Sequence, residues 1–64
     1  MRIGPAVMVK CNDGNEYVIT ERTTDNYMLG MSIKPGSSPS TQRLFKPNGH
    51  YAGSNKERNV AEIL

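Results

Sequence analysis

The chain has 64 residues, which suffices for one domain that buries only about 60% of its unfolded surface. Gly, Pro, Asn, Ser, Thr and Asp make up 27 of the 64 residues, and this share of turn formers excludes a coiled coil. The apolar runs are far shorter than the about 20 residues that a membrane span needs. One cysteine, Cys11, cannot form an internal disulfide. A single turn-rich domain over residues 1–64 remains.

The charge is distributed unevenly along the chain. Residues 1–30 carry three basic and four acidic side chains, and residues 31–64 carry five basic and two acidic ones, so the net charge of +2 comes from the second half. A half this mildly basic is compatible with an anionic partner, and equally with ordinary solubilising charge. With no signal-peptide pattern and a free cysteine in an apolar run, we expect a cytoplasmic protein without a membrane partner.

The first expected element is a β-hairpin. Residues 6–11 are rich in apolar and β-branched residues and predict the first strand. Residues 12–15 read Asn-Asp-Gly-Asn, and residues 16–20 predict the second, antiparallel strand. An Asp-Gly pair between two such runs predicts a type I′ turn. Tyr17 and Ile19 share one face of the second strand.

A third strand is expected over residues 26–33. Its larger apolar residues recur with period two, the spacing of one strand face: they are Tyr27, Leu29, Met31 and Ile33. This face should supply much of the core. Gly30 in the middle of the strand predicts a bulge or a sharp bend, as in small barrels.

The second half contains shorter elements. Residues 34–40 are rich in Pro, Ser and Gly and predict an exposed loop, and residues 41–46 predict a fourth strand. Pro47-Asn48-Gly49 then turns the chain into residues 50–52. For the C-terminus two readings stay open: a helix capped by Ser54-x-x-Glu57, or one helical turn followed by a strand over 59–64.

Four or five short strands joined by tight turns predict a mainly β fold, a small antiparallel five-stranded barrel or rolled sheet. The order of a tight Asp-Gly hairpin, a bent central strand, a long loop and a second tight hairpin resembles an SH3-like barrel. In its general style the chain also resembles compact accessory proteins of phages and bacteria. The resemblance to an SH3-like barrel covers most of the chain, and the likeness to accessory proteins rests on no particular residue. Neither implies any site residues.

The sequence does not indicate an enzyme. His50 is the single histidine, and pairing it with Cys11 as a nucleophile would require an exposed side chain in a predicted strand. No residues have the spacing of zinc ligands. We therefore expect neither a metal nor a cofactor.

The predicted function is binding of an anionic ligand, a nucleotide-like molecule or a nucleic acid, through the basic second half. Ammonium and guanidinium groups pair with phosphate, and imidazole and phenol rings contact a base or a sugar. The candidate residues are Lys34, Arg43, Lys46, Lys56, His50 and Tyr51. Hydroxyls and backbone amides of residues 36–41 offer a further oxyanion cradle.

Two alternatives remain. One is an inhibitor or adaptor that binds a host protein through a strand edge or through a surface around Met8 and Met28. The other is an oligomeric protein that sequesters a nucleotide between subunits. Because the core of so short a chain is small, we expect a homo-oligomer in either case.

Overall fold

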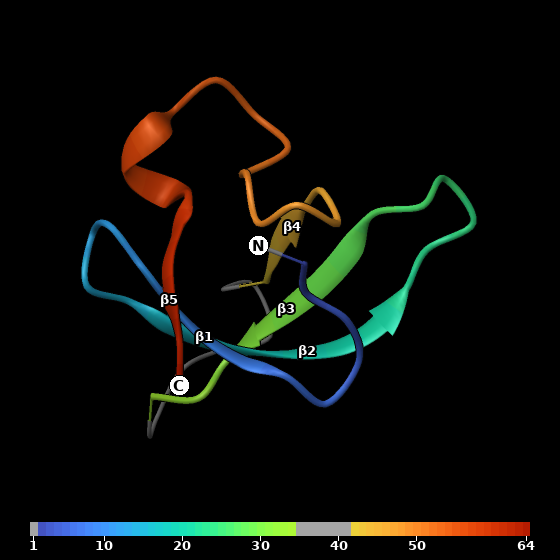
Figure 1. Cartoon of the computed structure of the whole chain (residues 1–64), viewed down its shortest axis with the longest axis horizontal. Coiled ribbons are helices and arrows are strands. Elements are labelled where there is room, and N and C mark those ends of the chain that lie inside the picture. The colour runs from blue at the N-terminus through green and yellow to red at the C-terminus, as the bar shows by residue number, and fades with distance from the viewer. Residues whose placement is uncertain (1, 35–41) are drawn as a thin grey trace.

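The computed structural model describes residues 2–34 and 42–64 and confirms a mainly β fold (Figure 1). Within these residues no helix is long and apolar enough to cross a membrane. The elements are five strands and one 3-10 turn: β1 (Met8–Cys11), β2 (Glu16–Arg22), β3 (Met28–Ser32), β4 (Arg43–Phe45), η2 (Lys56–Arg58) and β5 (Val60–Ile63).

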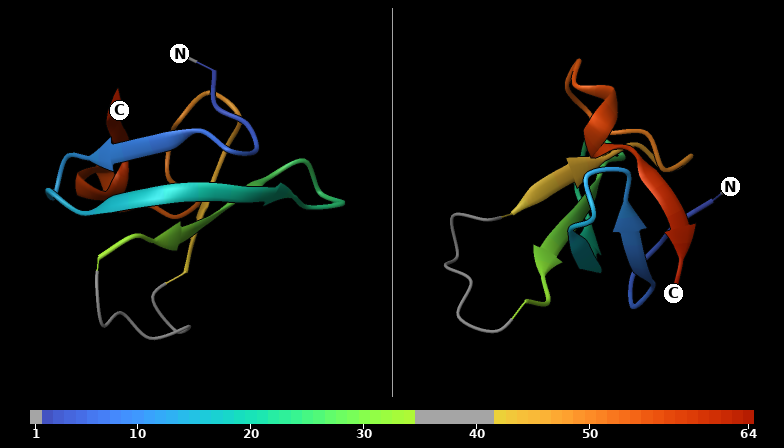
Figure 2. Two further views of the ribbon diagram at one scale, coloured as in Figure 1. Left: turned by 90° about the horizontal axis from the view of Figure 1, so that it is seen from below. Right: turned by 90° about the vertical axis from the view of Figure 1, so that its left-hand side faces the viewer.

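The five strands form one antiparallel sheet in the order β4-β3-β2-β1-β5. The sheet curls into a half-barrel, with the segment 46–59 on its concave side (Figures 1 and 2). This arrangement is compatible with an SH3-like or another small barrel. The last strand returns to pair with the first, so β1 lies inside the sheet and β5 and β4 form its two edges.

The first hairpin is present, but its turn is not of type I′. Gly14 has a φ of +87° whereas Asp13 does not have a positive φ, and a type I′ turn needs both. Gly14 N–H donates to the Cys11 carbonyl at 2.9 Å, and Cys11 N–H donates to the Asn15 carbonyl at 2.9 Å. This is a three-residue loop with glycine in the left-handed position. The strand starts at Met8 because Ala6, at φ +71°, belongs to the preceding turn.

The core lies on the concave face of the sheet. As predicted, Tyr17 and Ile19 face it together, and Cys11 is buried there. The other core residues are Ile3, Val9, Met28, Phe45 and Val60.

Two predictions about β3 are wrong. Leu29 and Met31 are half-buried on the convex face, whereas Met28 and Gly30 face the core. The reason is Phe45: a Cβ on Gly30 would lie 2.9 Å from the Phe45 ring, so only glycine lets this ring reach the sheet. Met28 is 0% exposed and cannot cover an interface. The bulge expected at Gly30 lies in the neighbouring strand instead. It is a register shift between Ile19, which pairs with Gly30, and Glu21 of β2.

The C-terminus follows the second of the two readings, a single helical turn and then a strand. The cap is Asn55 rather than Ser54, and its side-chain oxygen accepts from Glu57 N–H at 3.0 Å. Residues 50–52 form only a bridge between Tyr51 and Phe45. The predicted loop over 34–40, like the predicted oxyanion cradle at 36–41, falls almost entirely outside the described residues.

Candidate functional site

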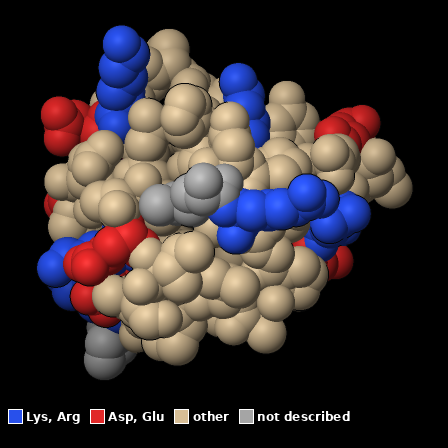
Figure 3. Space-filling view, in the orientation of Figure 1, with Lys and Arg blue, Asp and Glu red and all other residues tan. Residues whose placement is uncertain are grey.

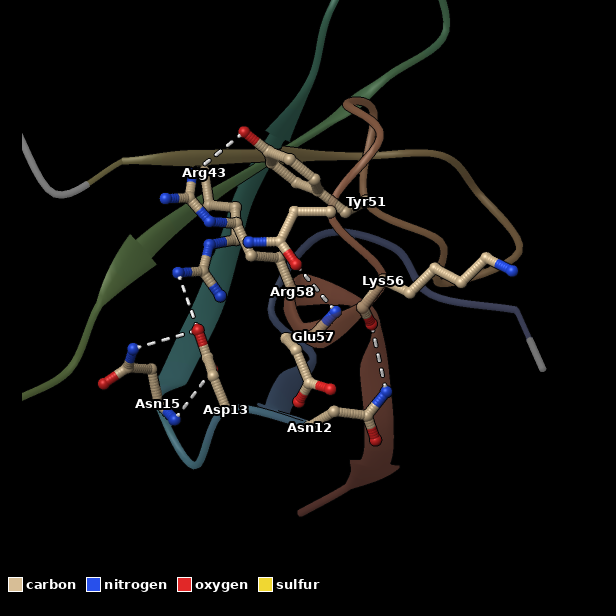
Figure 4. Close-up of polar contacts among 9 residues, drawn as sticks. Asn12, Asp13, Asn15, Arg43, Tyr51, Lys56, Glu57 and Arg58 are labelled. Atoms are coloured by element: carbon tan, nitrogen blue, oxygen red, sulfur yellow. Dashed lines mark hydrogen bonds and ion pairs between the residues drawn. The ribbon is translucent and has the colours of Figure 1, made fainter.

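Arg43 lies at the centre of a polar cluster on the concave side of the sheet (Figure 4). Its Nη2 forms an ion pair with Asp13 Oδ2 at 3.1 Å, and its side chain is only 9% exposed. Its Cζ lies 4.6 Å from the centroid of the Tyr17 ring, a cation–π distance. Its Nη1 is buried without a hydrogen-bond partner. Arg43 is therefore held inside the protein by Asp13 and Tyr17.

This cluster shifts the pKa values of its members. Burial acts to raise the pKa of Asp13, but hydrogen bonds from Arg43 and Asn15 outweigh it and hold this pKa below its usual value. Burial raises the pKa of the Cys11 thiol, and the neighbouring Arg43 offsets only part of this effect. Asp13 is thus the charged partner of Arg43, not a solvated acid of the hairpin as its exposed turn position suggests.

Tyr51 connects this cluster to the segment 52–59. The Cζ atoms of Arg58 and Arg43 lie 5.3 Å and 5.9 Å from the centroid of the Tyr51 ring, and Arg58 Nη1 donates to Tyr51 Oη at 3.1 Å. A Cβ on Gly53 would lie only 2.5 Å from the ring. Tyr51 is half-buried and in contact with these residues.

A pocket of about 280 Å³ opens beside Tyr51. Four of the six residues that the sequence singles out line it, together with three small or polar neighbours: Lys46, His50, Tyr51, Lys56, and Gly53, Ser54 and Asn59. No acidic side chain belongs to this lining. The turn at residues 46–49, closed by Gly49 N–H on the Lys46 carbonyl at 2.9 Å, supplies one wall, and η2 supplies another.

Asn59 fixes the two walls of the pocket relative to each other. Its side-chain oxygen accepts from Tyr51 N–H at 2.8 Å, and its backbone carbonyl accepts from Asn12 N–H at 2.9 Å. Neither Asn59 nor Arg58 is among the residues that the sequence singles out. The Asn-rich turns are visible in the sequence, but the pairing of Asn59 with Tyr51 depends on how the segment folds back.

The two other predicted residues lie apart from this pocket. Lys34 lines a second pocket, of about 340 Å³, with Gly14, Asn15, Glu16 and Ile33, and Arg43 is occupied by Asp13. On the face in Figure 3, basic and acidic side chains are interspersed. The charges on this face are therefore mixed, and four of the six predicted residues meet at the pocket beside Tyr51.

Among residues 2–34 and 42–64, no three side chains of His, Cys, Asp or Glu come close enough together to hold a metal ion. Comparison with protein-family models, curated proteins and solved structures yields no match for this chain.

Proposed function

We propose that the protein is a non-enzymatic binding module for a small anionic ligand of the nucleotide type, bound in the pocket beside Tyr51. The observation that carries this proposal is the convergence of Lys46, His50 and Lys56 on one pocket whose lining has no acidic side chain. Ammonium groups and an imidazole around one hollow favour a phosphate or a similar oxyanion.

The size and the lining of the pocket support a single phosphorylated group. Ligand pockets for drug-sized molecules start at about 300 Å³, and this one has about 280 Å³. The Ser54 hydroxyl and the Asn59 amide can hydrogen-bond a sugar or phosphate oxygen. Because Arg58, Arg43 and Gly53 already contact the Tyr51 ring, the ring stiffens the wall of the pocket more than it offers a stacking surface for a base.

Titration calorimetry with AMP, inorganic phosphate and a single-stranded oligonucleotide tests the proposal. We expect AMP to bind, and Lys46→Gln combined with Lys56→Gln to weaken binding at least about tenfold, since charge-assisted hydrogen bonds contribute about 1.5–3 kcal/mol each. The matched control is Lys10→Gln combined with Lys34→Gln, which removes the same charge away from this pocket. An equal loss in both double variants, or no binding to any probe, would refute the proposal.

Salt dependence separates a nucleotide from a nucleic acid. A nucleic acid that contacts several phosphates gives an affinity that falls steeply as salt increases, with a slope close to the number of contacts. For AMP, which carries no layer of condensed counterions, we expect the affinity to depend only weakly on salt. A slope of five or more for the oligonucleotide, together with tighter binding than AMP, would instead favour the nucleic acid.

We further propose that the half-barrel is SH3-like. Support comes from the strand order, in which the last strand pairs with the first, and from the 3-10 turn directly before that last strand. An experimental structure with a different strand order would contradict this assignment.

A further inference from the structure

The convex face of the sheet carries a row of apolar side chains. Following the strand register, Leu64 lies beside Met8, Met8 opposite Val18, and Val18 opposite Met31. Alternation along each strand turns these side chains away from the core, since Val9, Tyr17 and Ile19 face it. Seen from below, β1, β2 and β3 lie side by side in front of η2 (Figure 2, left).

This row is unusually apolar for a surface. Met8 is 43% exposed and Leu64 is 53% exposed, while the other two members are half-buried. Leu44, which pairs with Leu29 on the same face, is 38% exposed. Contiguous exposed apolar patches commonly mark interaction surfaces. Methionine suits such a surface because its flexible side chain fills gaps between curved faces.

A charged row runs beside the apolar one. Lys10 lies opposite Glu16 of β2 on one side and opposite Glu62 of β5 on the other. Among residues 2–34 and 42–64 the ion pair is that of Arg43 with Asp13, so Lys10 forms none with either acid. Across β5, β1 and β2 this row therefore reads Glu62, Lys10 and Glu16, a base between two acids.

We propose that this face binds a second copy of the chain, in a dimer whose two-fold axis runs between β1 and β2, parallel to them. A rotation about this axis stacks β1 of one copy on β2 of the other. Lys10 of each copy then faces Glu16 of the other copy. Met8 meets Val18, and Leu64 meets Met31, so the apolar rows match, and the two Lys10–Glu16 contacts join opposite charges.

The expected dimer is weak. Four strands about 4.8 Å apart make a face about 19 Å wide, and four residues at about 3.3 Å each make it about 13 Å long. The resulting area of roughly 250 Å² is small beside the roughly 800 Å² per partner of a standard interface. Association should therefore appear between about 10 μM and about 1 mM, in the range of weak interfaces. The segment 46–59, which carries the pocket beside Tyr51, lies on the concave side of the sheet (Figure 1). The pocket therefore stays open in this dimer.

Sedimentation equilibrium or native mass spectrometry over this range tests the dimer with charge variants. Lys10→Glu makes the charged row entirely acidic, and Glu16→Lys makes Lys10 and its neighbour both basic. Each variant alone should be monomeric, with self-association weakened at least tenfold. A 1:1 mixture should form a heterodimer, because both contacts between residue 10 of one copy and residue 16 of the other then join opposite charges.

The mixture distinguishes an interface from a change within one chain. Lys10 and Glu16 are also neighbours in the same sheet, so each variant alone could lose association through distortion, but only cross-copy contacts explain recovery on mixing. Val18→Lys, which should abolish the dimer without changing the circular dichroism spectrum, is a second check. A monomeric parent up to 1 mM, or variants that do not recombine, would overturn the proposal and leave a different protein as the occupant of this face.

Discussion

A charged residue near a basic cluster need not be available to a ligand, and Arg43 illustrates why. The sequence marks it as a phosphate contact because it belongs to the basic second half of the chain. Its partner, Asp13, lies 30 positions earlier in the turn between β1 and β2. Local patterns carry no information on this pairing, since only the curl of the sheet brings the turn to β4. Lys46, His50 and Lys56, in contrast, are close in sequence and meet at one pocket.

Replacing Asp13 by Asn should destabilise the protein by about 2 kcal/mol at pH 7. The change leaves Arg43, whose side chain is 9% exposed, without its counter-charge, and breaking a buried pair costs about 3–5 kcal/mol. The lower figure reflects that the Asp13 side chain is 23% exposed. Urea denaturation measures this difference, with Asp25→Asn, in the exposed turn between β2 and β3, as the control.

The effect of Asp13→Asn on the free energy of unfolding should depend on pH. The folded-state pKa of Asp13 is lowered from its usual value of 3.8, so its contribution is fully present above that value and is lost as the pH falls through the folded pKa. The gap in unfolding free energy between the parent and Asp13→Asn should therefore shrink from pH 7 toward pH 2. A gap that stays constant with pH would show that the ion pair does not stabilise the fold.

At the level of elements, the first hairpin, the turn at residues 47–49 and the approximate positions of the strands could be anticipated, because Asp-Gly and Pro-Asn-Gly mark turns and period two marks strands. Which face of a strand points inward could not. In β3, both sets of alternating residues contain apolar side chains. Phe45 determines which set faces the core, because its ring needs the space that Gly30 provides. The type of the first turn was equally hidden, because Asp-Gly suits more than one loop.

Asn59 allows the geometry of the pocket to be separated from its charge. Asn59→Asp keeps an oxygen acceptor for Tyr51 N–H, now 2.8 Å from the Asn59 side chain, but adds a negative charge to the lining. We expect nearly unchanged stability and at least about tenfold weaker AMP binding, through charge repulsion in a partly buried site. Asn59→Ala, which removes the acceptor without adding charge, is the comparison.

If Asn59→Asp binds AMP as the parent does, the pocket is not the anion site. If Asn59→Ala and Asn59→Asp lose both stability and binding to the same extent, the hydrogen bond to Tyr51 rather than the charge determines the result. Thermal unfolding and calorimetry on the same samples separate these outcomes.

At the level of the whole molecule, the curled sheet of this 64-residue chain has two faces. The described residues outside the strands cover mainly the concave face. The concave face takes the core and is closed by the segment 46–59, which also forms the cationic pocket. The convex face retains Met8, Leu44 and Leu64 in solvent. One curled sheet therefore separates a polar ligand site from an apolar contact surface.

This separation predicts that the two proposed activities are independent. The Lys10→Glu monomer should bind AMP with a dissociation constant within about twofold of the parent, since solvent screens charges beyond about 8 Å at physiological salt. Conversely, the double variant at Lys46 and Lys56 should dimerise as the parent does. Calorimetry below and above the dimerisation range, on all three proteins, measures both effects. Loss of AMP binding in the Lys10→Glu monomer would mean that the ligand site needs the second copy, and that the pocket beside Tyr51 is only part of it.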